Sequence, residues 1–385
     1  MNRRAFIRLA GGGVVLAAAP ALAGCSRSLP PEAIAAWQGP GEEADARRWI
    51  LSYAILAPHS HNLQSWLVDL GRPDEITLYC DLSRLLPQTD PYSRQIMMSQ
   101  GTFLELLELA ARERGLRARI ELFPEGEFDA KALDRRPTAR IRLAADRSVE
   151  RDPLFQQILR RRTNREAYEP REVPQAARGA IVASVAPYPI RVGFVGAGEP
   201  ERLRAQRAIA AEAWRIELVT PRTILESYKV LRVGPDEIAR HRDGIALNDP
   251  LARILVAVGL FDRTKAPASD DYATRSQIED FNAKLEATPA FFWMVTEGNE
   301  RRTQVNAGRA YARAQLAATS LGLSMQPISQ ALQEYPEQAK TYADIHRLLD
   351  AAPERSTVQM WTRLGYAPAI GPSPRRGLAE HVIKA

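Results

Sequence analysis

Apolar residues recur at helical spacing in some segments and at strand-like spacing in others, and this pattern predicts short strands set between helices. Residues 42–57 have the spacing of an amphipathic helix, which Pro58 ends. Residues 64–70 and 75–82 predict two strands joined by the turn sequence GRPD, and a long helix follows over 93–115. Two further strands are expected in this part of the chain, over 117–123 and 138–144.

The second part of the chain repeats this order with more insertions. Helical material fills roughly 199–287, and the apolar segment 289–296 shows no alternation, as in a strand buried on both faces. The other expected helices span 152–162, 174–185 and 306–323, and the other expected strands span 189–196, 324–328 and 357–366.

Two of the long predicted helices resemble each other. The segments SQGTFLELLELAARERGL (99–116) and NAGRAYARAQLAATSLGL (306–323) both place a glycine early, carry Leu and Ala on one face and end in Gly-Leu. Each is followed by a short extended segment. As a pair in matched positions, the two helices indicate a duplication within the chain.

The first 25 residues are expected to be an export signal rather than part of the fold. Arg3 and Arg4 resemble a twin-arginine signal, and the apolar run 10–24 is too short to span a bilayer comfortably. The sequence Leu22-Ala23-Gly24-Cys25 resembles a lipobox, in which Cys25 is lipidated; an ordinary signal peptide followed by a chance cysteine is the alternative. We therefore expect a periplasmic or cell-surface protein, attached to a membrane by its lipidated N-terminus.

Charge and cysteine content limit the partners and the source of stability. The 385 residues carry a net charge of +6, which falls to +3 without the three arginines of residues 1–24. Such a balance does not favour nucleic acid as a partner. Cys80 is the only cysteine besides Cys25, so no internal disulfide is expected and the hydrophobic core must supply the stability.

Two motifs carry candidate chemistry. The segment RRRTNR (160–165) concentrates arginines around Thr163, and the planar fork of arginine suits bidentate binding of phosphate. Its alternative is a solvated helix end, where the helix dipole favours cations. The second motif is the loop APHSHNLQSW (57–66), which groups two histidines with a serine, two amides and a tryptophan.

The loop 57–66 has two alternative interpretations besides the binding of a planar ligand. His59 and His61, spaced by two, would share one face of a strand as a pair of metal ligands, but no third ligand stands out. Ser60 would need a sharp nucleophile elbow to act in a hydrolase, and the chain has no Gly-x-Ser-x-Gly sequence.

Together with two later segments, these motifs resemble the nitroreductase superfamily. RRTNREAY resembles its opening arginine motif, APHSHNLQSW its loop ending in Asn-x-Gln-Pro-Trp, GLSMQPISQ its segment on the flavin N5 side, and PSPRRGL its C-terminal phosphate contact. The resemblance covers most of the chain after the leader. It implies FMN as cofactor and an α+β, nitroreductase-like fold with two mixed or antiparallel sheets surrounded by helices.

The resemblance also assigns roles to single residues. It implies that the loop amides contact the ribityl chain and the polar edge of the isoalloxazine, that the arginines hold the phosphate, and that backbone N–H groups near Ile328 face N5. Trp66 is expected to pack in the core. The implied cofactor-binding residues are Ser60, His61, Asn62, Gln64, Arg161, Thr163, Arg165, Gln326, Pro327, Ile328, Ser329, Arg375 and Arg376.

The order of the motifs predicts a fused pseudo-dimer with one intact and one decayed flavin site. The first half has the loop but no hydroxyl-containing arginine motif, and the second half has APYPIRVGF where the loop should recur. This is the pattern of the Acg-like branch of the superfamily. The expected parts are the leader 1–25, a linker 26–41, half one 42–150, and half two 151–385 with a lid-like helical insertion at about 199–287.

The implied activity is a two-electron, ping-pong oxidoreduction on quinone or nitroaromatic acceptors. No catalytic side chain is required, because the flavin carries the chemistry. An exported protein meets little NAD(P)H, so a membrane quinol or a redox protein is an alternative donor. A non-catalytic lipoprotein that holds flavin is the alternative function, and the pseudo-dimer is expected to be a monomer.

Overall fold

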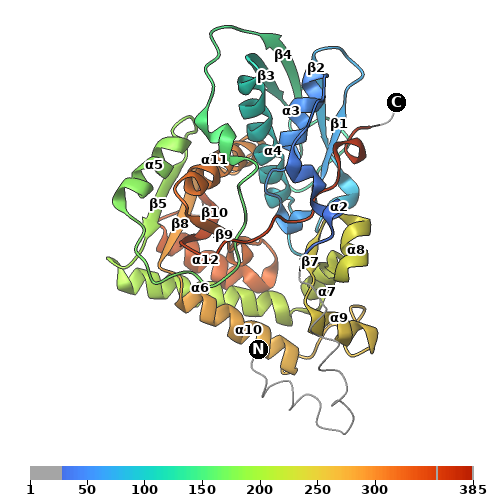
Figure 1. The fold of residues 1–385 in the computed structure, drawn as a ribbon. Coiled ribbons are helices and arrows are strands. Elements are labelled where there is room, and N and C mark those ends of the chain that lie inside the picture. The colour runs from blue at the N-terminus through green and yellow to red at the C-terminus, as the bar shows by residue number, and fades with distance from the viewer. Residues whose placement is uncertain (1–27, 353, 384–385) are drawn as a thin grey trace.

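Two four-stranded antiparallel sheets form the framework of the protein (Figure 1). The computed structural model describes residues 28–352 and 354–383, so the expected leader and Cys25 lie outside the described residues. The first sheet has the order β1-β2-β4-β3 and the second has the order β5-β8-β10-β9. The strands are β1 (Trp66–Asp69), β2 (Glu75–Cys80), β3 (Leu116–Leu122), β4 (Ala139–Ala145), β5 (Arg191–Val195), β8 (Ala290–Glu297), β9 (Ser324–Pro327) and β10 (Ser356–Gly365).

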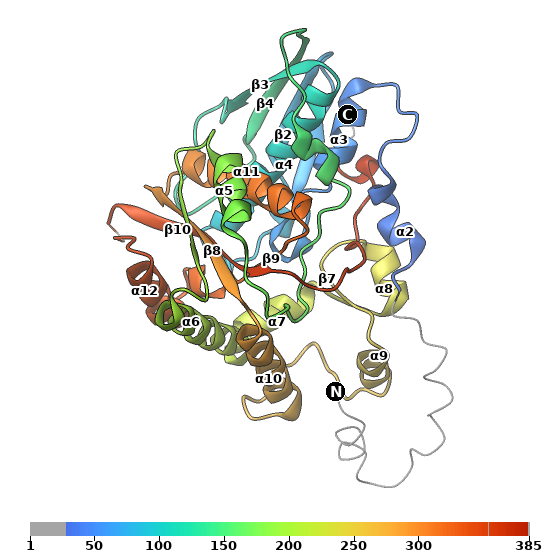
Figure 2. The same cartoon turned by 60° about the vertical axis from the view of Figure 1, so that its left-hand side comes forward.

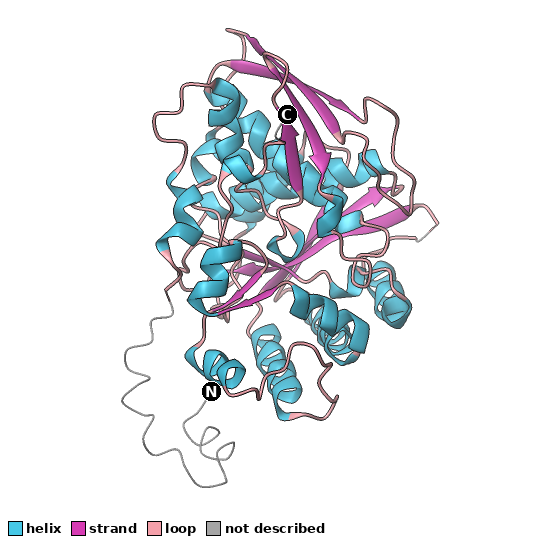
Figure 3. Cartoon of the chain, turned by 90° about the vertical axis from the view of Figure 1, so that its right-hand side faces the viewer, coloured by secondary structure: helices cyan, strands magenta, loops and turns pink. Residues whose placement is uncertain are grey.

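The two sheets repeat one topology. In each, the first strand pairs with the second, a 20-residue helix follows the second strand, and the fourth strand lies between the second and the third. The α+β class and the internal pseudo-dimer are therefore confirmed. Figure 3 shows the sheets as two separate groups of strands with helices between and below them. The division of the chain at residue 150 stays a prediction.

The two central helices, α4 (Arg94–Glu113) and α11 (Arg301–Ser320), cross each other in close contact, with a glycine at the eighth position of each. A Cβ on Gly101 would lie 1.9 Å from the carbonyl oxygen of Val305, and a Cβ on Gly308 would lie 1.8 Å from that of Met98. The contacts are reciprocal, as in a twofold interface between identical subunits. Only glycine permits this approach of one backbone to another.

The remaining helices cover the sheets and form the insertion. In Figure 1, α6 and α10 run along the lower edge, and α7, α8 and α9 form a separate group at the lower right. No helix of residues 28–352 or 354–383 is long and apolar enough to cross a membrane. Their bounds are α2 Pro31–Ile34, α3 Ala46–Ala54, α5 Gln175–Val185, α6 Pro200–Val219, α7 Pro221–Lys229, α8 Gly234–His241, α9 Pro250–Ala257, α10 Tyr272–Glu286 and α12 Ala339–Leu348.

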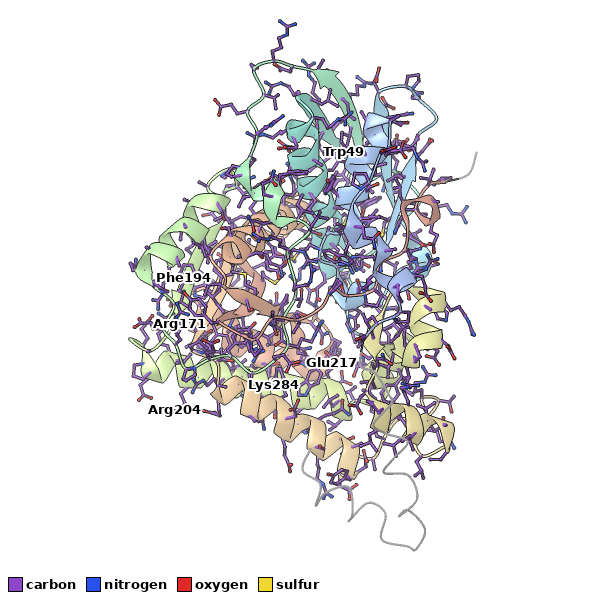
Figure 4. All side chains as sticks on the ribbon, in the orientation of Figure 1. Trp49, Arg171, Phe194, Arg204, Glu217 and Lys284 are labelled. Atoms are coloured by element: carbon purple, nitrogen blue, oxygen red, sulfur yellow. The ribbon has the colours of Figure 1, made fainter. Side chains whose placement is uncertain are left out.

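The hydrophobic core divides between the two halves. Trp49 packs against the core of the first half and Phe194 against a core of the second, and both are labelled in Figure 4. Trp66 is fully buried on β1, as expected. Strand β8 is buried at seven of its eight positions, which explains why its sequence shows no alternation. Figure 2 shows α6, α10 and α12 below the second sheet.

Four predicted segments differ from the structure. The helix expected over 42–57 begins only at Ala46, because the Asp45 carboxylate caps it by accepting from Arg47 N–H at 2.8 Å. The helix expected over 152–162 is a 3₁₀ turn at Pro153–Gln157. The insertion contains a parallel pair, β6 (Leu231–Val233) and β7 (Ile245–Leu247), and the linker contains α2 and a 3₁₀ turn at Ala35–Gln38.

The helix crossing predicts that alanine lowers the stability of the fold at Gly101 and Gly308 but not at Gly179. Gly101→Ala or Gly308→Ala should destabilise the fold by about 3 kcal/mol or more, since the new methyl group meets backbone atoms that cannot turn aside. Gly179→Ala in α5 is the control: no heavy atom lies within 4 Å of its new Cβ, so the variant should gain about 0.5–1 kcal/mol. Urea unfolding measures all three, and a neutral Gly308→Ala would contradict the crossing.

Candidate functional site

The loop 57–66 holds a strained backbone. His61, Asn62 and Gln64 all have positive φ, at 49°, 56° and 54°. Residues with a Cβ in this region cost of order 1–3 kcal/mol each and persist only where surrounding contacts fix them. Such clusters are typical of binding sites.

The C-terminal segment fixes the loop through Gln64. This side chain is fully buried: its Oε1 accepts from Arg376 N–H at 2.9 Å, and its Nε2 donates to the Arg242 carbonyl at 2.9 Å. Arg376 also donates from Nη2 to the Gln64 carbonyl at 2.5 Å. Because its polar atoms bond to protein groups, Gln64 positions the chain here, and its expected contact with a cofactor stays a prediction.

Asn62 is held in a similar way. Its Nδ2 donates to the carbonyls of Pro374 at 3.0 Å and Gly244 at 3.2 Å, and its Oδ1 accepts from Nη1 of Arg375. Gly244 N–H in turn donates to the Asn62 carbonyl at 3.1 Å. The loop is therefore fixed from one side by the C-terminal segment and from the other by the insertion, and Asn62 orients Arg375.

His59 and His61 of the loop differ in their hydrogen bonds. His59 donates from Nδ1 to the Ser60 carbonyl at 2.7 Å, and its Nε2 accepts from Ser65 Oγ at 2.7 Å. Burial lowers its pKa to about 3, so it is a neutral, satisfied histidine that shapes the loop. His61 lies 3.2 Å from Ser60 Oγ, and burial, followed by the charge of Arg165, lowers its pKa to about 4. Within the part of the chain that the structure describes, no three His, Cys, Asp or Glu residues form a group that could hold a metal.

Three arginines surround Trp37. The guanidinium carbons of Arg161, Arg162 and Arg375 lie 5.5, 4.6 and 5.4 Å from its ring centroid, and its Nε1 donates to the Ser373 carbonyl at 2.8 Å. We call these four residues the arginine cluster. Cation–π contacts with one indole partly compensate the charges, but three cations share a single ring.

No carboxylate among the described residues forms an ion pair with these three arginines. Arg161 donates to the Leu56 carbonyl at 3.1 Å and to Gln315 Oε1 at 3.2 Å, and Arg375 donates to the Ala57 carbonyl at 3.0 Å. Arg161 is 2% exposed and Arg375 is 3% exposed. Their hydrogen bonds therefore go to neutral oxygens, and the positive charge stays uncompensated.

Burial and the mutual repulsion of these arginines lower the pKa values of Arg161 and Arg375. Burial, with a further contribution from Arg162, lowers the pKa of Arg161 to about 10. Burial and the charges of Arg161 and Arg162 hold the pKa of Arg375 well below its usual range. The Nε atoms of Arg161 and Arg375 are also buried without a hydrogen-bond partner. A bound anion would supply both the missing charge and the missing acceptors.

The other residues of the arginine motif lie beside β9. Thr163 forms a parallel bridge with Met325, and its Oγ1 accepts from Gln315 Nε2 at 3.4 Å. Arg165 is exposed and forms no ion pair within the described ranges, yet its charge reaches His61. The charge of Arg165 therefore acts on the loop 57–66, and the roles expected for Thr163 and Arg165 at a cofactor stay predictions.

The segment 326–329 was expected to face the flavin N5, and this role stays a prediction. Gln326 and Pro327 belong to β9, and Gln326 has a buried Oε1 without a partner. Ile328 N–H donates to the Trp361 carbonyl at 2.9 Å, so it extends the sheet and is not free for a ligand. Of the two residues expected to face N5, Ser329 alone keeps an N–H for which the described residues offer no acceptor.

Three residues of the site were not predicted. Trp37 lies in the expected linker, Arg162 was assigned no contact, and Gln315 lies on α11, where it binds both Arg161 and Thr163. An isolated tryptophan before the first long helix gives no periodic signal. Arg376, expected as an equal alternative to Arg375, instead binds Gln64.

The segment 186–194, where the loop was expected to recur, contacts a group of compensated charges. Tyr188, in the segment where the loop was expected to recur, donates to Glu105 at 2.5 Å. Glu105 pairs with Arg309 at 3.0 Å and with Arg313 at 2.9 Å, and Arg313 also pairs with Asp152 at 2.8 Å. Each cation here has an anion, in contrast to the arginine cluster.

Comparison with known proteins agrees with the motifs. No family model matches the chain. The chain is 28% identical over 354 residues to two proteins of Mycobacterium tuberculosis, "Putative NAD(P)H nitroreductase Rv3131" (strain H37Rv) and "Putative NAD(P)H nitroreductase MT3217" (strain CDC 1551), covering 88% of this chain and 92% of each relative.

Solved structures give weaker similarities. The FMN-dependent nitroreductase NfnB from Mycobacterium smegmatis, in complex with NADPH, matches at 19% identity and a TM-score of 0.38, covering 60% of this chain and 96% of that chain. The NfnB of Sphigopyxis sp. strain HMH matches at 21% identity and a TM-score of 0.36, covering 61% and 99%. Over most of its length the chain is therefore similar in sequence to proteins named as nitroreductases.

The buried, neutral His59 predicts that acid weakens the fold. Its pKa is about 3 in the folded state and near 6.5 in the unfolded state, so the unfolded chain binds more protons between these values and stability falls as the pH drops from 6.5 towards 3. His59→Gln should reduce the slope of the unfolding free energy between pH 6 and pH 4 by about 1.4 kcal/mol per pH unit. Urea unfolding at several pH values measures this slope, and equal slopes would show that His59 is charged in the folded state.

Proposed function

We propose that the protein binds FMN and uses it for two-electron oxidoreduction. The observation that carries this proposal is the arginine cluster, where three cations, two of them almost fully buried, have no carboxylate partner among the residues that the structure describes. Buried cations of this kind favour a bound anion. The similarity to proteins named as NAD(P)H nitroreductases, together with the resemblance of the motifs to that superfamily, supports the phosphate of a flavin nucleotide as this anion.

The cluster fits a phosphate in its chemistry. The forked guanidinium groups of Arg161 and Arg375 carry orphaned Nε donors, and arginine binds phosphate through two parallel hydrogen bonds. Asn62 holds Arg375 in place through its Oδ1, and Gln315 does the same for Arg161. Because Arg161 and Arg375 are already held in place, they would bind the phosphate without a large loss of side-chain entropy.

Other residues would orient the remainder of the cofactor. Thr163 and Arg165 provide a hydroxyl and a free cation next to the cluster, and Gln326 provides a buried amide oxygen that lacks a donor. The N–H of Ser329 would stabilise negative charge at the reduced ring. When bound, FMN would supply the electron transfer itself; the protein would position it and exclude water.

We further propose a ping-pong reaction with a quinone or nitroaromatic acceptor. The names of the curated relatives support NAD(P)H as donor. If the twin-arginine and lipobox resemblances hold, the protein acts outside the cytoplasm as a lipid-anchored member of the Acg-like branch, and a membrane quinol or redox protein is then the alternative donor.

One observation favours a second function, the holding of flavin without turnover. The insertion contacts the loop directly, because Arg242 and Gly244 bind the buried Gln64 and the partly buried Asn62. A covered loop would slow the exchange of substrates. Anaerobic NADPH added to the purified protein separates the two functions: bleaching of the flavin identifies a reductase, and a persistent yellow colour favours holding or another donor.

Conservative changes in the arginine cluster test the flavin site. The chain purified without added cofactor should be yellow, and Arg161→Lys and Arg375→Lys should each lower the bound flavin at least tenfold, because a lysine cannot bind phosphate in bidentate fashion. Visible spectra before and after heat release measure the flavin content.

Arg301→Lys is the matched control. Arg301 is also almost fully buried, at 1% exposure, but lies at the N-terminal end of α11 and binds the carbonyls of Asp129 and Tyr92. This variant should keep its flavin. A colourless parent protein that FMN cannot reconstitute would refute the proposal, and equal losses in all three variants would show a general effect on folding.

A further inference from the structure

Apolar side chains gather on the surface around α9. Of the nine exposed large hydrophobic residues among those described, five lie between residues 245 and 272. Ile254, Val258 and Leu260 are 39%, 61% and 75% exposed, and we call these three residues the α9 patch. Ile254 and Val258 are four residues apart and therefore share one face of the helix end.

The helix is unusual in the fold because it buries nothing. None of the residues of Pro250–Ala257 is buried, although six of its eight residues are Leu, Ile, Val or Ala. Its only charged residue, Arg253, lines a hollow of about 190 Å³ together with Gly234 and Asp236 of α8. The sole charge of the helix is thus directed towards α8, and the outer face is left apolar. Such a face is typical of an interaction site.

The described chain begins beside this helix. Asn248 Nδ2 donates to the Ser28 carbonyl at 2.8 Å, and Asp249, the next residue, caps α9 by accepting from Leu251 N–H at 3.0 Å. Ser28 follows Cys25 by three positions, a span of at most about 10 Å. The apolar run 10–24 comes directly before that cysteine. Any membrane that holds residues 10–25 therefore lies within reach of α9.

We propose that the α9 patch lies against a lipid surface and forms a second membrane contact next to the N-terminus. An apolar helix face that carries no charge can enter the boundary between headgroups and acyl chains. A second contact beside the N-terminal anchor would strengthen the attachment and fix the orientation of the protein on the surface. The inference rests on the proposed membrane attachment of the N-terminus and is independent of FMN binding. The helices α7, α8 and α9 would then lie on the membrane side, with α5 away from it (Figures 1 and 2).

A local probe tests this contact in the full chain. In a Cys25→Ser background, a hexahistidine tag on residue 1 and a nickel-chelating lipid in the vesicles anchor the N-terminus. Leu260→Cys would carry an environment-sensitive fluorophore, and Val182→Cys on α5, 43% exposed, is the matched control. Cys80 is 5% exposed and burial raises its pKa to about 12, so it should not react. Vesicles of phosphatidylcholine and phosphatidylglycerol, with and without a lipid-attached quencher, provide the surface.

The expected result is a blue shift of the probe at 260 on addition of vesicles, with loss of most of its emission to the lipid quencher, and neither effect at 182. A probe at 260 that stays in water while the tethered chain is bound to the vesicles overturns the proposal. A blue-shifted probe that lipid quenchers do not reach would also overturn it. In that case, a shift that does not depend on protein concentration would indicate that residues 1–24 cover the patch. A shift that grows with protein concentration would indicate that a second copy of the chain covers it.

Discussion

The close crossing of α4 and α11 determines the rest of the architecture. At Gly101 and Gly308, each helix backbone contacts the other with no side chain between them. Both helices also hold parts of the site. On α4, Thr102 donates to the Pro58 carbonyl at 2.7 Å, which anchors the loop 57–66; on α11, Gln315 binds Arg161. A shift of either helix would therefore move the loop relative to the arginine cluster.

The symmetric framework carries an asymmetric distribution of charge. On one side, Glu105 neutralises Arg309 and Arg313, and Asp152 adds a further anion. On the other side, Arg161 and Arg375 are buried against neutral oxygens and Trp37. Ion pairs stabilise the first side within the chain itself, whereas the second side reaches a comparable balance only with a bound anion. This asymmetry supports the proposal of one anion site per chain.

The sequence was informative where local chemistry decides the structure. Periodicity located the strands of both sheets, and the shared glycine position in residues 99–116 and 306–323 revealed the duplication. The arginines that meet at Trp37 come from 161–162 and 375, and only the resemblance to a known superfamily connected them. Trp37 could not be predicted, because a single aromatic residue in a linker has no spacing to interpret. The strands β6 and β7 were also missed, since three-residue strands give no alternation.

The number of FMN molecules bound by one chain is the most direct test of a fused pseudo-dimer with one competent site. Native mass spectrometry of the purified protein, supplied with excess FMN and transferred without denaturation, measures this number together with the oligomeric state. The account predicts a single chain that carries one FMN. Two FMN molecules on one chain, or flavin found only in an assembly of two chains, would contradict it.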